Sequence, residues 1–154
     1  GEGRTNAELS VAKLSPTARN EAIEKLKAAF TLLFTVFGVP SVFYGDEAGL
    51  EGYEDPFNRR CYPWGKEDKT LIEFFRTLGK VRKDLASVLS DGTYAPVTAK
   101  NGLLIYERYN QNGTVKVVAN AQKTEYVLDE IVHDEITNSD LKVLSPYSAI
   151  IIKY

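Results

Sequence analysis

Residues 38–49 read Gly38-Val39-Pro40-Ser41-Val42-Phe43-Tyr44-Gly45-Asp46-Glu47-Ala48-Gly49, a short apolar run that ends at a glycine and two carboxylates. A run rich in β-branched and aromatic residues and bounded by turn residues predicts a buried strand, here over 39–44. Helical spacing of apolar residues predicts a helix on each side, over 15–37 and 68–89. Because one strand between two helices cannot complete a sheet, we expect this half to belong to a larger α/β sheet or barrel.

From residue 90 onward, apolar and polar residues alternate, which is typical of strands with one buried face. Asn112-Gly113 lies between two such runs and is a strong signal for a tight hairpin. The spacing of the runs predicts a small antiparallel β-sandwich, so we divide the chain into residues 1–89 and 90–154. The expected strands are 92–98, 103–109, 114–120, 124–129 and 147–154.

The composition excludes several classes of protein. The chain has 154 residues, of which 44% are apolar and 26% charged, as in one or two globular units. With a net charge of -2 and no membrane-length apolar run, neither nucleic acid nor a membrane is indicated as a partner. The single cysteine, Cys61, excludes an internal disulfide and favours a reducing, cytoplasmic compartment; no cofactor motif or metal site is seen. The absence of methionine suggests that the chain is a fragment.

Residues 48–67 form a long aperiodic stretch rich in carboxylates, arginines and aromatic residues. Loops of this length inside a compact domain tend to be functional, and this mixture of side chains suits a sugar. Asp46 and Glu47 are adjacent, so an extended backbone would point them to opposite faces, and a structural role is the better interpretation. Asp55 and Arg59 either hold the loop together or contact a ligand. Tyr53 and Trp64 likewise serve either packing or sugar stacking, while His133 and Cys61 suggest no function.

The motif at 38–49 resembles the segment of α-amylase family (family 13) glycoside hydrolases that forms the last strand of a (β/α)8 barrel and its following loop. The continuation Asp55-Pro56-Phe57-Asn58-Arg59-Arg60, with Tyr62-Pro63-Trp64, resembles the neopullulanase, cyclomaltodextrinase and maltogenic amylase branch. The resemblance implies an α/β plus all-β chain: the last βα portion of the barrel, with its seventh and eighth helices, followed by the β-sandwich called domain C.

The resemblance also implies a function. Members of this family are retaining enzymes that use an Asp nucleophile, a Glu acid/base and a second Asp. All three belong to motifs that precede the seventh barrel helix, so no residue of this chain is expected to be catalytic, and the chain alone is expected to be inactive. The expected ligand is an α-glucan oligosaccharide held by Asp55 and Arg59, with Tyr53 and Trp64 as weaker candidates, and the expected protein partner is the remainder of the barrel.

Two other interpretations remain open at this stage. In the first, the β-sandwich is a non-catalytic carbohydrate-binding or scaffolding module with exposed aromatic residues. Alternation places at least half of its candidates in the core; they are Tyr94, Tyr106, Tyr109 and Tyr126. In the second, the chain is an interaction module whose apolar helix faces pack against a partner or against a second copy.

Overall fold

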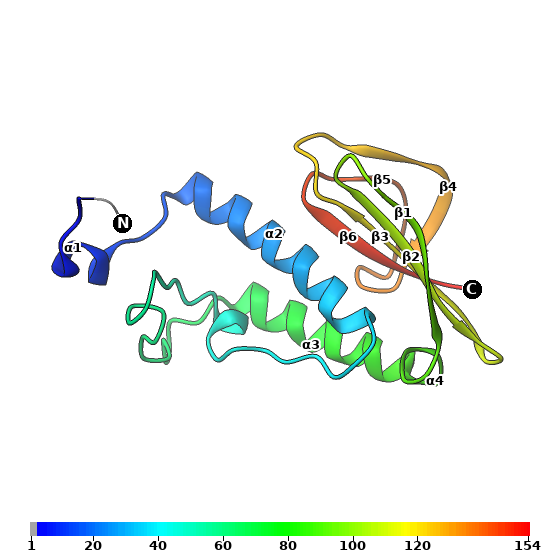
Figure 1. Cartoon of the computed structure of the whole chain (residues 1–154), viewed down its shortest axis with the longest axis horizontal. Coiled ribbons are helices and arrows are strands. Elements are labelled where there is room, and N and C mark those ends of the chain that lie inside the picture. Colours follow the sequence, from blue (N-terminus) through cyan, green and yellow to red (C-terminus); the bar gives the residue numbers. More distant parts are fainter. Residues whose placement is uncertain (1–2) are drawn as a thin grey trace.

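The computed structural model describes residues 3–154 and shows helices packed on one face of a small β-sandwich (Figure 1). The helices are α1 (Asn6–Val11), α2 (Pro16–Thr35), a 3-10 turn (Asp46–Ala48), α3 (Lys69–Asp84) and α4 (Ala86–Leu89). The strands are β1 (Thr93–Lys100), β2 (Leu103–Asn110), β3 (Gly113–Asn120), β4 (Tyr126–Asp134), β5 (Ser139–Leu144) and β6 (Ser148–Lys153).

The helices begin where the sequence provides caps. The side chain of Ser15 accepts a hydrogen bond from the backbone of α2, and Asp68 does the same for α3. The predicted helix 68–89 is interrupted at Leu85, where φ and ψ are -97° and 11°, and continues as α4. Helix α1 was not predicted, although Thr5 and Glu8 form a capping box that marks its start. None of the helices within residues 3–154 is both long enough and apolar enough to cross a membrane.

The strand predicted at 39–44 is wrong for this chain. Residues 39–43 have no regular secondary structure, and Phe43 is 52% exposed. A β-strand is stabilised by backbone hydrogen bonds to neighbouring strands, and within residues 3–154 no strand pairs with this segment. The apolar run therefore stays at the surface, with Val39 92% exposed.

The predicted β-sandwich is confirmed. One sheet has the order β1-β2-β3-β6 and the other consists of β4 and β5, all antiparallel. Asn101 and Gly102, both at positive φ, make the β1–β2 turn, and the predicted β2–β3 hairpin is present. Strand β5 was missed by the sequence prediction. The core between the sheets is built from Val118, Leu128, Val132, Leu144, Ile150 and Ile152.

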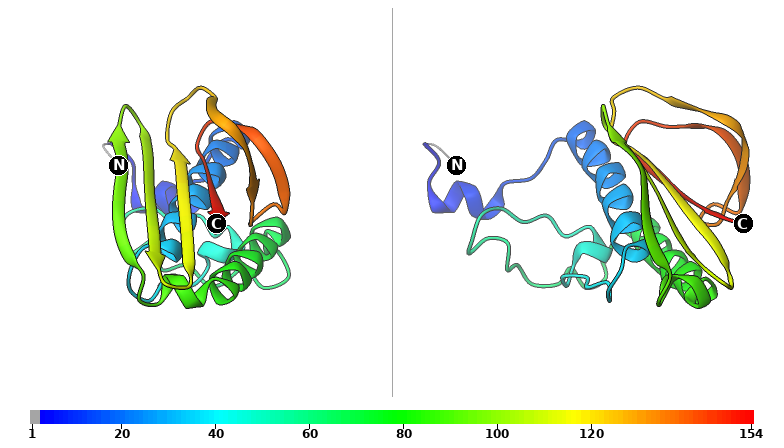
Figure 2. Two further views of the ribbon diagram at one scale, coloured as in Figure 1. Left: turned by 90° about the vertical axis from the view of Figure 1, so that its right-hand side faces the viewer. Right: turned by 45° about the vertical axis from the view of Figure 1, so that its right-hand side comes forward.

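Helices α2 and α4 lie against the outer face of the larger sheet (Figure 2), and α3 packs on α2 and adds Leu78 and Val81 to the same core. The fully buried residues of α2 are Thr31 and Thr35. Of the predicted apolar face, Phe30 and Phe34 pack partly buried against the core, whereas Leu33 and Phe37 are exposed. The hydroxyl of Thr35 lies 2.6 Å from that of Tyr106 in β2. Fully buried Arg108 donates to the carbonyl oxygens of Thr35, Leu89 and Gly92. The helical and all-β parts therefore share a core, and the division after residue 89 stays a prediction.

Candidate functional site

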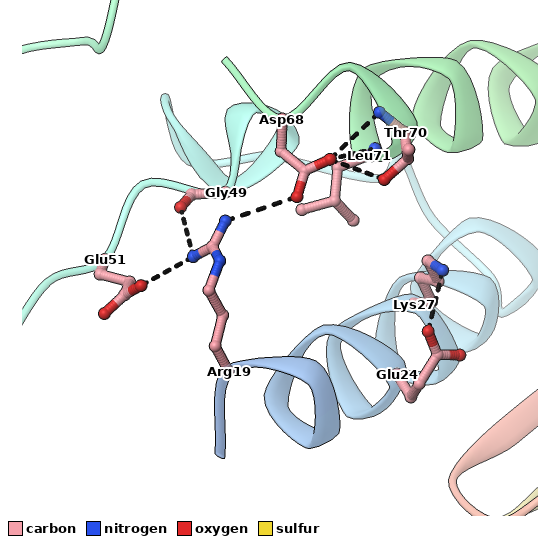
Figure 3. Close-up of polar contacts among 8 residues, drawn as sticks. All are labelled: Arg19, Glu24, Lys27, Gly49, Glu51, Asp68, Thr70 and Leu71. Carbon is pink, nitrogen blue, oxygen red and sulfur yellow. Dashed lines mark hydrogen bonds and ion pairs between the residues drawn. The ribbon is translucent and has the colours of Figure 1, made fainter. Parts of the chain in front are cut away.

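The long loop that follows the 3-10 turn is closed at its neck. The backbone N–H of Asp68 donates to the carbonyl oxygen of Ala48 at 3.0 Å. Arg19 of α2 bridges both ends of the loop, donating to the carbonyl of Gly49 at 3.1 Å and to the carboxylates of Glu51 at 2.8 Å and Asp68 at 3.4 Å (Figure 3). Residues 49–67 thus form a compact surface loop whose ends are fixed to the helices.

The neck depends on two local features. Asp68 accepts hydrogen bonds from Thr70 and from the N–H of Leu71; the Thr70 hydroxyl is the main cause of the lowered pKa of this carboxyl, which stays ionised opposite Arg19. Gly49 has a φ of 68°, and a Cβ at this position would lie 2.7 Å from Nη2 of Arg19. Only glycine combines this backbone conformation with the close approach of the arginine.

Asp46 and Glu47 do not form an acid/base pair. Glu47 accepts a hydrogen bond from the N–H of Gly45 at 2.9 Å. It therefore caps the start of the 3-10 turn, which agrees with the structural role expected for this pair of carboxylates. Partial burial raises the pKa of Asp46, and the charge of neighbouring Glu47 raises it further.

The tip of the loop presents the two main candidates together. Nη2 of Arg59 lies 3.1 Å from Oδ1 of Asp55, and the side chains are 61% and 68% exposed, respectively. The pair holds the loop together and also faces solvent, where its remaining donors and acceptors are open to a ligand. Trp64 is 81% exposed and its ring centroid lies 4.5 Å from that of Tyr62. Tyr53 is half-buried and lines a groove on the inner side of the loop.

That groove was not predicted from the sequence. It has a volume of about 600 Å³ and lies between the start of α2, residues 12–15 and residues 49–53. Ala22, Ile23 and Leu26 of α2 form part of its mostly apolar wall. Their three- and four-residue spacing was the available signal, since it marked a helix face in need of cover. The exposed apolar residues at 37–43, after the end of α2, add further apolar surface to the helical half.

The remaining residues considered from the sequence do not form a functional site. Tyr106 is buried and Tyr109 is 43% exposed, so the four tyrosines of the sandwich do not form an exposed aromatic row. His133 lies within β4 rather than between strands, and its Nδ1 is 2.8 Å from Asp140 of β5, a hydrogen bond that raises the pKa of the imidazole. Cys61 is exposed. Over residues 3–154, no cluster of His, Cys, Asp and Glu is arranged to hold a metal ion.

Comparison with known proteins relates this architecture to glycoside hydrolases. No family model matches the chain. A cyclomaltodextrinase from Bacillus sp. is 41% identical over 108 residues, which are 68% of this chain and 19% of the enzyme. An amylopullulanase from Thermoanaerobacter thermohydrosulfuricus is 38% identical over 99 residues, or 64% of this chain and 7% of the enzyme.

The fold agrees with these sequence matches. The crystal structure of an Anoxybacillus α-amylase superposes with a TM-score of 0.74 and 26% identity, covering 85% of this chain and 32% of that one. The chain thus spans a fifth or less of the length of the two curated relatives described above. By sequence and fold, the chain is related to one segment of the α-amylase family of glycoside hydrolases.

Proposed function

We propose that the chain is the C-terminal, substrate-side segment of an α-glucan-acting retaining glycoside hydrolase that cleaves α-1,4 glucosidic bonds. The observation that carries this proposal is the 41% identity over 108 residues to a cyclomaltodextrinase. In the complete enzyme the segment closes the barrel and presents the loop 49–67 to substrate. The proposal keeps residues 1–89 as the barrel portion and 90–154 as domain C, in a cytoplasmic enzyme.

The exposed apolar surface supports the assignment to a larger barrel. Phe37, Val39 and Phe43 are more than half exposed, and monomeric proteins seldom leave large contiguous apolar surfaces in water. The remainder of the barrel would cover this run and provide the neighbouring strands that its backbone needs. In isolation, the same surface favours association between copies of the chain.

The arrangement of carboxylates supports a segment without cleaving activity. A glycosidase needs two carboxyl groups that flank one bond, about 5–5.5 Å apart in retaining enzymes. Here Glu47 is occupied in capping the 3-10 turn, and Asp55 is paired with Arg59. In the proposed enzyme, as the family resemblance implies, the catalytic carboxylates belong to the part that precedes this segment.

The Asp55–Arg59 pair is suited to bind a glucose unit. A carboxylate accepts hydrogen bonds from sugar hydroxyls, and a guanidinium donates to their oxygens in a fixed fork. Both groups are exposed at the loop tip while the neck is fixed by Arg19, so the pair is presented on a stable support. Trp64 and Tyr53 offer aromatic surface on the same loop.

The test is steady-state hydrolysis of a maltooligosaccharide by the full-length enzyme that carries this segment. Replacement of either Asp55 or Arg59 by alanine should raise KM roughly tenfold, since a hydrogen bond to a charged group contributes about 1.5–3 kcal/mol. The value of kcat should change little, because the contact is made with bound substrate and transition state alike.

The matched control is the Glu73–Arg76 pair of α3, which is equally exposed, with an N–O distance of 3.5 Å. Alanine at either control position should leave KM unchanged. If Asp55→Ala and Arg59→Ala behave like the control variants, the loop tip does not contact substrate and this part of the proposal fails.

A further inference from the structure

Arg60 adjoins the candidate substrate pair but is directed into the protein. Its Nη2 donates to the carbonyl oxygens of Leu9 at 3.2 Å and Ala12 at 3.4 Å, which belong to the end of α1. Its own backbone carbonyl accepts a hydrogen bond from the hydroxyl of Tyr44 at 3.0 Å. One residue thus joins α1, the segment before the 3-10 turn, and the tip of the loop.

The two neighbouring arginines therefore have opposite surroundings. Arg59 is exposed and pairs with Asp55, whereas Arg60 is largely covered and has no carboxylate among its hydrogen-bond partners within residues 3–154. The positive charge of Arg60 instead meets carbonyl groups at the C-terminal end of α1, where partial negative charge favours a cation. This position favours Arg60 as an anchor for the loop tip.

The rest of the loop does not replace this anchor. The neck is held by Arg19, and a second link joins the N–H of Leu14 to Glu51 at 2.8 Å, also near the neck. Near the tip, the hydroxyl of Tyr44 also bonds the backbone carbonyl of Arg60, while Phe57 N–H to the carbonyl of Glu54 and Arg59 N–H to that of Pro56 are local turns. The turns shape the tip, and the side chain of Arg60 links it to α1.

We propose that Arg60 is a positioning residue for glucan binding: it clamps the loop tip to α1 and thereby places the Asp55–Arg59 pair. This inference rests on the proposed function of that pair. This role requires a positively charged side chain at position 60 that donates hydrogen bonds to both carbonyl oxygens at the end of α1, those of Leu9 and Ala12. Lysine meets that requirement, and it also removes Nε of Arg60, which is buried and has no partner within residues 3–154. Glutamine has donors but no charge.

The first test uses hydrogen exchange of the 154-residue chain. Arg60→Gln should speed exchange of the Phe57 and Arg59 amides roughly tenfold, since a tenfold change corresponds to about 1.4 kcal/mol and lies within the range of one charge-assisted hydrogen bond. The amide of Asp68 at the neck should not change. Arg60→Lys should retain most of the protection, and Arg76→Gln on α3 serves as the matched control. Unchanged exchange at both tip amides in Arg60→Gln would overturn the clamp.

The second test is a double-mutant cycle in the full-length enzyme. Arg60→Gln should raise KM for a maltooligosaccharide several-fold with kcat within about twofold, and Arg60→Lys should restore most of the affinity. In a background with alanine at both Asp55 and Arg59, the effect of Arg60→Gln on KM should vanish, because neither substrate-binding group is left to place. Additive effects would overturn the positioning role.

The two proposals fail in distinguishable ways. If Asp55→Ala leaves KM unchanged, the substrate role of the tip fails, whatever the exchange experiment shows. If Asp55→Ala raises KM but Arg60→Gln leaves it unchanged, the substrate role stands and the positioning role fails.

Discussion

The hydrogen bond between the hydroxyl groups of Thr35 and Tyr106 predicts that the helices and the sheet unfold together. The two oxygens are 2.6 Å apart, and both side chains are buried where α2 meets β2. Tyr106→Phe removes one hydrogen bond, while the hydroxyl of Thr35 keeps the carbonyl of Thr31 as an acceptor at 2.6 Å. The free energy of unfolding should therefore fall by the contribution of one buried hydrogen bond, about 1 kcal/mol, because no donor is left without an acceptor.

Thermal and urea unfolding measure this loss. For a chain of this size, 1 kcal/mol corresponds to roughly 2–4 °C in Tm. Tyr109→Phe is the matched control on the same strand; its ring is 43% exposed, and the change should stay within about 0.5 kcal/mol. In a Thr35→Val background, Tyr106→Phe should have little further effect. If Tyr106→Phe is indistinguishable from Tyr109→Phe, the hydroxyl pair does not couple the helices to the sheet.

The same substitution has a pH dependence with a definite sign. Burial raises the pKa of Tyr106 to about 12, whereas an unfolded tyrosine titrates near about 10. The folded state thus favours the protonated phenol, and this stabilisation is complete below pH ~10 and is lost as the pH rises toward 12. The stability difference between wild type and Tyr106→Phe should accordingly shrink over that interval. A difference that grows with pH would contradict the buried, neutral hydroxyl.

Three further predictions concern other parts of the molecule. Gly92→Ala would place a Cβ 2.3 Å from a backbone carbonyl oxygen and should lower the free energy of unfolding by more than about 2 kcal/mol. Gly79→Ala on α3 places its Cβ where nothing lies within 4 Å, and it should raise the free energy of unfolding by up to about 1 kcal/mol. Thermal unfolding measures both changes. Sedimentation of the 154-residue chain should show self-association that Val39→Asp reduces; a wild-type monomer at high concentration would refute this. Arg19→Gln should lower the free energy of unfolding by only about 1 kcal/mol, because its ion pairs are partly exposed. It should also speed hydrogen exchange of the amides that close the loop neck, and unchanged exchange would contradict the bridging role.

The sequence predicts elements whose signal is local. Ser15 and Asp68 mark helix starts, and Asn112-Gly113 marks a hairpin, because each acts within a few residues. Strand β5 was missed because Asp140 and Lys142 interrupt its few apolar residues and weaken the strand signal; it forms in the fold by pairing with β4. The strand at 39–44 was overpredicted for the opposite reason: its local signal is strong, but no neighbouring strand pairs with it in the described chain.

The site was only partly predictable for the same physical reason. Asp55 and Arg59 are four residues apart, so their pairing is a local matter. Arg19 and Arg60 contact residues about 30 to 50 positions away in the chain, which no local pattern reveals. The burial of Thr31 and Thr35 beside Phe30 and Phe34 is likewise a tertiary effect, because α2 packs against the sheet and Thr35 meets the hydroxyl of Tyr106 there.

The most direct test of the central claim is hydrolysis of a maltooligosaccharide and of β-cyclodextrin by the purified 154-residue chain, beside the full-length enzyme that carries it. The account predicts turnover by the full-length enzyme and none by the chain, since the cleaving carboxylates lie outside it. Turnover by the chain itself, abolished by substitution of Asp46, Glu47 or Asp55, would contradict the account and identify the catalytic group.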